Sequence, residues 1–268
     1  MVRAAADRAF LPAKSVFEQV GNMMILTGKT IVAAVRPPFP YGTEFVGQFL
    51  FALQLCWFPM LISTVAFGFG APGLQAANFL TLFGALDRLG GFFILASVRE
   101  FAPFVTAVVV AGVAGTAITA DLGARKIREE LDALQVLGVD PIKNLVVPRF
   151  LSLMLITGLL DIYALIFGII GGILAELLYG APLGGFFATL FNNASVTDLW
   201  GSVLKTMLFG AIIAIVCSYK GMNASGGAEG VGRAVNEAVV IAFLGVFAFN
   251  YVFTQTLLAT HPEISVIK

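Results

Sequence analysis

Apolar residues fill five long stretches of this chain, and shorter polar segments separate them. The stretches cover residues 45–69, 90–120, 150–178, 203–219 and 239–258. A helix that crosses the hydrocarbon core of a bilayer needs about 20 mostly apolar residues. The pattern therefore predicts an all-α integral membrane protein with about five transmembrane helices. Residues 71–89 carry Asp87 and Arg88, and we expect this segment to lie on the membrane rather than to cross it.

A stripe of apolar residues precedes the first stretch. From Val16 to Val35 such residues recur every three or four positions, while Lys14 and Lys29 lie off the stripe and two prolines follow at once. This spacing is typical of an amphipathic helix. Such a helix either lies in the membrane interface or packs, as a soluble helix, on a partner protein. We favour the interfacial position.

The composition also indicates a membrane protein, and it points to no metal site and no nucleic-acid partner. Hydrophobic residues make up 59% of the chain and charged residues 12%, about half the charged share of an average soluble domain. The 16 basic residues balance the 16 acidic ones, so no strong field indicates nucleic acid as a partner. Cys56 and Cys217 lack the spacing of metal ligands, and we expect no metal site. We expect a single domain over residues 1–268, with a cytoplasmic or interfacial helix in 1–43 and the transmembrane region in 44–268.

Basic residues lie unevenly on the two sides of the predicted membrane. With the N-terminus inside, the cytoplasmic segments contain 12 of the 16 Lys and Arg residues, and the outer loop over 179–199 contains none. Cytoplasmic loops carry the excess of Lys and Arg in membrane proteins. We therefore expect a multi-pass protein of the cytoplasmic (inner) membrane. The N-terminus and Arg128 would lie inside, and Ser195 and the C-terminus outside.

Two acidic residues interrupt the third stretch. Asp161 and Glu176 lie on one helix face with Gly168 and Gly172, whose G-x-x-x-G spacing allows close helix packing. A carboxylate that faces lipid is costly, so these intramembrane polar residues should face protein or water. We expect Asp161 to need a buried partner, which the sequence does not identify. Glu176 lies near the outer end and is expected to reach water.

Arg99 and Glu100 interrupt the second stretch, and Pro103 follows them. Adjacent helical residues point about 100° apart, so these two side chains cannot face one surface. We expect Arg99 to extend towards the outer interface. Glu100 either faces an internal cavity or is an exposed residue at the start of a helix that begins at Pro103.

The polar segment after the second stretch predicts a short amphipathic helix. Its apolar residues Ile127, Leu131, Leu134 and Leu137 recur at helical spacing, and Gly138 follows as a stop signal. Its charged residues are Arg128, Glu129, Glu130 and Asp132. Such a helix either lies on the membrane or docks into a groove of a soluble protein.

The residues from Arg99 to Ile142 resemble the signature region of MlaE/YrbE-type permeases, the membrane subunits of MCE-associated lipid ABC transport systems. The elements E-x-x-P, a span rich in small residues, A-x-L-G, E-x-x-D-A-L and G-V-D-P-I follow in the family's order. A second block, KGMNASGGAEGVGRA over 220–234, resembles the family's last cytoplasmic loop and favours an actinobacterial Mce-locus YrbE. Val113 departs from the pattern, because many relatives carry a basic residue there.

This resemblance implies a non-catalytic permease of an ATP-driven lipid transporter. The helix from about Ala124 to Leu137 would be the coupling helix, docked on a separate ABC ATPase that binds ATP and magnesium. The chain itself would need no cofactor. A second permease would pack alongside, a paralogue in an actinobacterial system and otherwise another copy. Lipid would pass through a cavity between the permeases towards MCE-domain proteins outside the membrane. On this chain the cavity residues would be Glu100, Phe101, Phe104 and Val105.

The sequence leaves two alternative classes of function, an intramembrane enzyme and an ATP-independent membrane protein. An intramembrane enzyme would need a catalytic set, but the chain has neither G-x-S-x-G nor H-E-x-x-H, and its one histidine is His261. The Gly28-Lys29-Thr30 sequence lacks the first glycine of a P-loop, where Met23 stands. The second class is an ATP-independent scaffold or channel-like protein. Co-purification of an ATPase would distinguish it from a permease.

Overall fold

The computed structural model describes the backbone of residues 2–262 and the side chains of Lys14 and of residues 16–262. Within these residues every regular element is a helix. Five helical stretches are long and apolar enough to cross a membrane: Gly42–Leu82, Leu86–Ile127, Ile142–Leu178, Val196–Met222 and Gly227–Thr260. The prediction of an all-α membrane protein with about five spans is confirmed.

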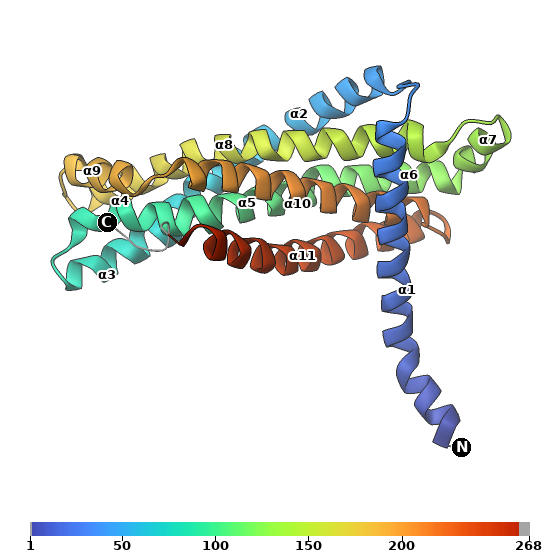
Figure 1. Cartoon of the computed structure of the whole chain (residues 1–268), viewed down its shortest axis with the longest axis horizontal. Coiled ribbons are helices and arrows are strands. Elements are labelled where there is room, and N and C mark those ends of the chain that lie inside the picture. The colour runs from blue at the N-terminus through green and yellow to red at the C-terminus, as the bar shows by residue number, and fades with distance from the viewer. Residues whose placement is uncertain (1, 263–268) are drawn as a thin grey trace.

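The spans lie side by side in an elongated bundle (Figure 1). Helix α1 (Val2–Val35) runs across one end of the bundle, and α7 (Glu130–Val136) projects from that same end. Helix α9 (Leu183–Asn193) covers the opposite end. We call the end at α1 and α7 the inner end and the end at α9 the outer end.

Two of the spans are single α-helices, α10 (Val196–Met222) and α11 (Gly227–Thr260), and the other three are composite. The first span consists of α2 (Gly42–Gly68), η1 (Phe69–Gln75) and α3 (Ala76–Leu82). The second consists of η2 (Leu86–Arg88), α4 (Leu89–Phe93), η3 (Ile94–Phe101), α5 (Ala102–Val110), η4 (Ala111–Gly115) and α6 (Thr116–Ile127). The third consists of η5 (Ile142–Val146) and α8 (Val147–Leu178).

Prolines account for three of the π-helical segments in these spans. Pro72 lies within η1, Pro103 follows η3 directly after Ala102, and Pro148 follows η5 directly after Val147. Proline has no N–H, and its ring clashes with the carbonyl four residues earlier. The helix therefore widens locally and continues. Residues 71–82 complete the first span and residues 86–89 begin the second, in place of the surface segment expected over 71–89.

Helix α1 ends at Val35, where the apolar stripe predicts its end. It rests on the inner end of α10, because Lys220 Nζ donates to Gln19 Oε1 at 2.8 Å. Met23 and Leu26 are buried against the bundle, whereas the Phe17 side chain is 77% exposed. An apolar side chain exposed at this end of the bundle is consistent with the interfacial position, which stays a prediction.

Glycines allow α2 and α8 to pack with their backbones in contact. A Cβ atom at Gly171 would lie 2.5 Å from both the Phe69 nitrogen and the Val65 carbonyl oxygen, and one at Gly172 would lie 2.6 Å from the Phe93 ring. Neither backbone atom can turn aside as a flexible side chain could. Gly168 of the motif is equally close, because a Cβ atom at Gly68 of α2 would clash with the Gly168 carbonyl oxygen. The close packing that the G-x-x-x-G spacing predicts for this span is therefore present.

Substitution of Gly171 by alanine tests this packing. We expect Gly171→Ala to destabilise the protein by about 1–3 kcal/mol, the usual cost of overpacking a core. Gly112→Ala is the matched control, because a Cβ atom there meets nothing within 4 Å. The apparent melting temperature of the purified protein in detergent should fall for Gly171→Ala only. Equal melting temperatures for both variants would show that the α2–α8 contact is not tight.

Candidate functional site

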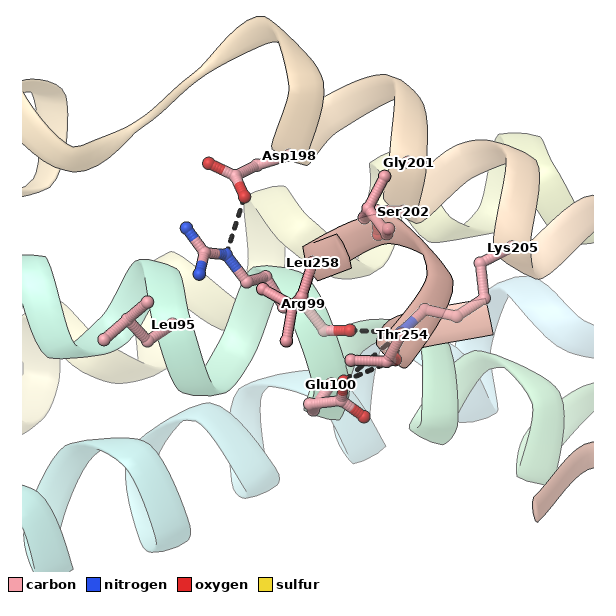
Figure 2. Close-up of a pocket in the computed structure, with 10 residues that line it drawn as sticks. Leu95, Arg99, Glu100, Asp198, Gly201, Ser202, Lys205, Thr254 and Leu258 are labelled. Carbon is pink, nitrogen blue, oxygen red and sulfur yellow. Dashed lines mark hydrogen bonds and ion pairs between the residues drawn. The ribbon is translucent and has the colours of Figure 1, made fainter. Parts of the chain in front are cut away.

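A cavity of about 210 Å³ lies towards the outer end of the bundle, between η3, α10 and α11. Leucine side chains form part of its wall, and a cluster of charged and hydroxyl side chains forms the rest (Figure 2). The lining residues are Leu95, Arg99, Glu100, Asp198, Gly201, Ser202, Lys205, Thr254, Leu257 and Leu258. The cavity is therefore amphipathic and contains both signs of charge.

Arg99 forms an ion pair with Asp198 on one side of this cavity. Arg99 Nε donates to Asp198 Oδ1 at 2.6 Å, and the two side chains are only 13% and 2% exposed. Asp198 also completes a capping box at the start of α10, because its backbone N–H donates to Ser195 Oγ at 3.1 Å and its Oδ2 accepts from the Ser195 N–H at 3.2 Å. Arg99 thus pairs with the first turn of α10, towards the outer end of the bundle, and its expected extension to the outer interface stays a prediction.

Sequence reasoning missed Asp198, although a signal for its structural role was present. Ser195 and Asp198 form the S-x-x-D pattern that marks a helix start before an apolar run. The pattern locates the cap but does not reveal the ion pair, because Arg99 lies 99 residues earlier in the chain.

Lys205 and Glu100 form the second charged pair of the cavity. Lys205 Nζ lies 3.5 Å from Glu100 Oε1 and donates to the Thr254 hydroxyl at 3.2 Å. Glu100 also accepts from Thr254 at 2.9 Å and from the Asn250 side-chain amide at 2.8 Å. The Lys205 side chain is only 3% exposed, whereas Glu100 is 39% exposed. Glu100 therefore presents a carboxylate to the cavity, held in place by α10 and α11.

Pro103 explains why a lysine is placed here. In an α-helix the Arg99 carbonyl would accept from the N–H of residue 103, but proline has none. Lys205 Nζ donates to that carbonyl at 2.5 Å. The lysine therefore bonds a carbonyl that Pro103 could not bond in α-helical register, and it balances the neighbouring carboxylate.

The intramembrane acidic residues have different surroundings. Asp161 is fully buried, and its Oδ2 accepts from the Ser202 hydroxyl at 2.7 Å, which supplies the partner that the sequence could not name. Glu176 is also fully buried, and neither of its carboxylate oxygens has a hydrogen-bond partner among the described residues. The expectation that Glu176 reaches water is wrong, because its side chain is fully enclosed by the bundle.

Phe101, Phe104 and Val105 do not line the cavity described above. Phe101 and Val105 line a separate small recess between η3, α5, α2 and α8. Phe104 packs against Phe247 of α11, with ring centroids 4.7 Å apart. Of the four residues assigned to a cavity, only Glu100 lines the cavity within this chain, and their assignment to a cavity between two permeases stays a prediction.

At the inner end, the helix expected over 124–137 is divided in two. Residues 124–127 belong to α6, and Glu129, with φ of 60°, reverses the chain before α7 begins at Glu130. Leu131 is buried and Leu134 is partly buried, so they hold α7 on the bundle. Val136 and Leu137 are 88% and 76% exposed. The exposed apolar tip of α7 therefore lies at its C-terminal end.

Ion pairs accompany the other candidate docking residues. Arg128 donates to Glu130 at 2.6 Å, and this hydrogen bond raises the pKa of the Arg128 guanidinium. Lys126 pairs with Asp132 at 3.0 Å. In the part of the chain that the structure describes, no three His, Cys, Asp or Glu side chains lie together as metal ligands.

Comparison with known proteins identifies the family. Residues 45–256 match the permease MlaE family. The chain belongs to the MlaE permease family. A probable ABC transporter permease of Synechocystis is 38% identical over 180 residues, 66% of this chain and 68% of the relative. One of Rickettsia typhi is 29% identical over 242 residues, 90% of this chain and 92% of the relative.

A plant relative belongs to the same set of similar proteins. Protein TRIGALACTOSYLDIACYLGLYCEROL 1 of Arabidopsis thaliana, a chloroplastic protein, is 32% identical over 183 residues, which make up 68% of this chain and 52% of the plant protein. As an MlaE-family permease, this chain is a multi-pass, non-catalytic membrane subunit of an ABC transporter. An ATPase subunit is its implied partner.

The Arg99–Asp198 pair of this MlaE-family permease can be tested by neutralising one partner. Asp198→Asn leaves a buried guanidinium without its counter-ion, and we expect a loss of about 3–5 kcal/mol in the free energy of unfolding. Unfolding in mixed detergent and SDS micelles measures this loss. Addition of Arg99→Leu should restore most of the stability.

The control is Glu18→Gln, which removes an exposed pair with Lys14 at 3.8 Å. Such pairs contribute about 0–1 kcal/mol. An Asp198→Asn variant as stable as Glu18→Gln would show that Arg99 does not depend on Asp198.

Proposed function

We propose that this MlaE-family permease is the membrane subunit of an ATP-driven lipid transporter, and that it passes a hydrophobic lipid between the membrane and MCE-domain proteins outside it. The amphipathic cavity at the outer end is the observation that carries this proposal. A lipid has a polar head group and apolar chains. Arg99, Glu100 and Lys205 line the cavity and suit the head group, and the leucine side chains of its wall suit the apolar chains.

The size of the cavity favours a site shared by two permeases. Pockets that enclose a drug-sized ligand usually measure about 300–1,000 Å³, and this one measures about 210 Å³. One chain therefore has room for a head group but not for a whole lipid. Helix α11, which lines the cavity, exposes Val240, Leu244 and Tyr251. This apolar face suits acyl chains or a second permease, either a paralogue or another copy.

The name of the plant relative supports a lipid substrate. Trigalactosyldiacylglycerol, after which that protein is named, is a diacylglycerol lipid with a sugar head group. The likeness supports the class of substrate and not a particular head group. Membership of an actinobacterial Mce locus stays a prediction.

The inner end suits the partner ATPase, which would bind ATP and magnesium. Helix α7 presents Val136 and Leu137 beside the charged residues Glu130 and Asp132. An apolar tip with charged neighbours is typical of a helix that docks into a groove of a soluble protein. We propose the cytoplasmic membrane as the location, with the inner end facing the cytoplasm.

Lipid transport by the reconstituted complex tests the function. The permease, its ATPase and the MCE-domain protein are reconstituted in proteoliposomes, and transfer of a fluorescent phospholipid is followed with and without ATP. Glu100→Lys would place two ammonium groups side by side, which repel by roughly 4 kcal/mol at a separation of 4 Å and an effective dielectric constant of 20. We expect this variant to assemble but not to move lipid.

Glu100→Gln is the matched control, because an amide oxygen can still accept from Thr254 and Asn250. It leaves Lys205 without its counter-ion but adds no second positive charge, so it should retain more of the transport rate than Glu100→Lys. An assembled Glu100→Lys complex with the wild-type rate would remove this cavity from the lipid path. Transfer that does not need ATP would favour the scaffold or channel-like alternative.

Cysteine labelling in intact cells tests the orientation. Ser195 and Arg128 are less suitable than their neighbours, because Ser195 caps α10 and Arg128 pairs with Glu130. Val196 and Val136 are 81% and 88% exposed and replace them. With Cys56 and Cys217 removed, Val196→Cys should react with a membrane-impermeant thiol reagent and Val136→Cys should not. The opposite pattern would place α7 outside and exclude it as the ATPase contact.

A further inference from the structure

A row of alternating charges connects α7 with the inner ends of α2 and α8. Its members come from α6, α7, α8 and α2 and from the turn between α6 and α7. In order from α7, the ion pairs are Arg128–Glu130 at 2.6 Å, Glu130–Arg125 at 4.0 Å, Arg125–Asp121 at 3.1 Å, Asp121–Arg149 at 2.6 Å and Arg149–Glu44 at 3.9 Å. We call these six residues the inner charge row.

Asp121 is the junction of the inner charge row. Its Oδ1 accepts from Arg125 Nε, one turn further along α6, and its Oδ2 accepts from Arg149 Nη2 on α8. The side chains of Arg125 and Asp121 are 35% and 41% exposed, whereas the Arg149 side chain is only 1% exposed. Water can replace the partner of an exposed ion. It cannot replace the partner of Arg149, so the Asp121–Arg149 pair is the obligatory link.

The inner end of α2 has room to move beside this link. A cavity of about 260 Å³ lies between α2, α6 and α8, lined by Gln48, Phe51, Ala117, Ile118, Asp121, Arg125 and Arg149. Glu44, in the first turn of α2, approaches Arg149 only to 3.9 Å, which is too long for a hydrogen bond. Ser152 of α8 donates to the Phe45 carbonyl at 2.9 Å. Helix α2 is thus attached to α8 and only loosely held by the guanidinium.

We propose that Asp121 and Arg149 are positioning residues that transmit the docking of the ATPase on α7 to the inner ends of α2 and α8. The proposal rests on the proposed function, because it takes α7 as the ATPase contact. A displacement of α7 moves Glu130 and, through Arg125, the Asp121 carboxylate. Arg149 is shared between Asp121 and Glu44, so movement of one carboxylate changes the attraction on the other. The position of α2 beside the cavity then follows that of α7.

The number of lipid molecules moved per ATP hydrolysed is the measurement that separates this role from a structural one. It is determined on the full complex in proteoliposomes, with both rates taken from the same sample. Asp121→Asn keeps the shape of the side chain and removes its charge. We expect it to lower lipid moved per ATP by about 2- to 30-fold, the range seen for single changes in coupled networks. ATP hydrolysis and ATPase co-purification should persist.

Two further variants serve as rescue and control. Asp121→Glu keeps the charge and should retain the ratio of the wild type. Asp140→Asn removes a carboxylate at the same end of the bundle, which accepts from the Ile142 N–H at 2.9 Å and lies outside the inner charge row. It should leave the ratio unchanged. A wild-type ratio for Asp121→Asn, or equal losses for Asp121→Asn and Asp121→Glu, would overturn the proposal.

If the Asp121→Asn complex does not assemble, the Glu44→Gln variant tests the proposal instead. Glu44 is 43% exposed and its pair with Arg149 is long, so its loss leaves the buried pair intact. A lower ratio for Glu44→Gln supports the proposal, and an unchanged ratio contradicts it. A wild-type complex that hydrolyses ATP without moving lipid would contradict the proposed function instead. The two failures are therefore distinguishable.

Discussion

Every backbone polar group within a membrane span must find its partner inside the protein, because hydrocarbon offers none. This constraint determines how the second span is built. Pro103 has no N–H to bond the Arg99 carbonyl in α-helical register, and Lys205 Nζ donates to that carbonyl from another helix. The ammonium then requires a counter-ion, which Glu100 provides with support from Thr254 and Asn250. The N–H that Pro103 lacks is thus connected, through this set of hydrogen bonds and the ion pair, to side chains of α10 and α11.

The second span carries charged groups near both of its ends, and their spacing matches the membrane. Glu100 and Asp121 are 21 residues apart, which corresponds to roughly 32 Å along a helix. The hydrocarbon core of a bilayer is about 30 Å thick. The outer cavity and the inner charge row therefore lie near the two faces of the core, connected by one helix. Between them η4 and most of α5 and α6 are apolar, so no further ion pair is needed within this part of the span.

Hydropathy predicted the number of spans because lipid exposure demands long apolar stretches, whatever their neighbours are. The same patterns predicted the end of α1 and the presence of a short polar helix after the second span. They did not locate the first span's end, because the π-helical turn at Pro72 lets the helix continue to Leu82. They placed the start of α7 too early, because Glu129 adopts a left-handed conformation that residue type does not demand.

The candidate site was predictable only in part. An interrupted apolar stretch marked Arg99 and Glu100 as residues that need partners. Asp198 and Lys205 come from α10, and contacts between residues about 100 apart leave no periodic signal in one sequence. Glu176 shows a similar limit: its position near the end of the span suggested contact with water, whereas the tertiary packing buries its side chain fully.

The π-helical segments also have a consequence for how such a chain can change over evolution. A π-helical turn is equivalent to an α-helix that has received one additional residue. Loss of one residue from Ile94–Phe101 would return this part of the span to ordinary α-helical geometry. The residues on its N-terminal side would then rotate by about 100° relative to α5. A single-codon deletion would therefore exchange the side chains that face Asp198, while the hydrophobicity of the span would hardly change.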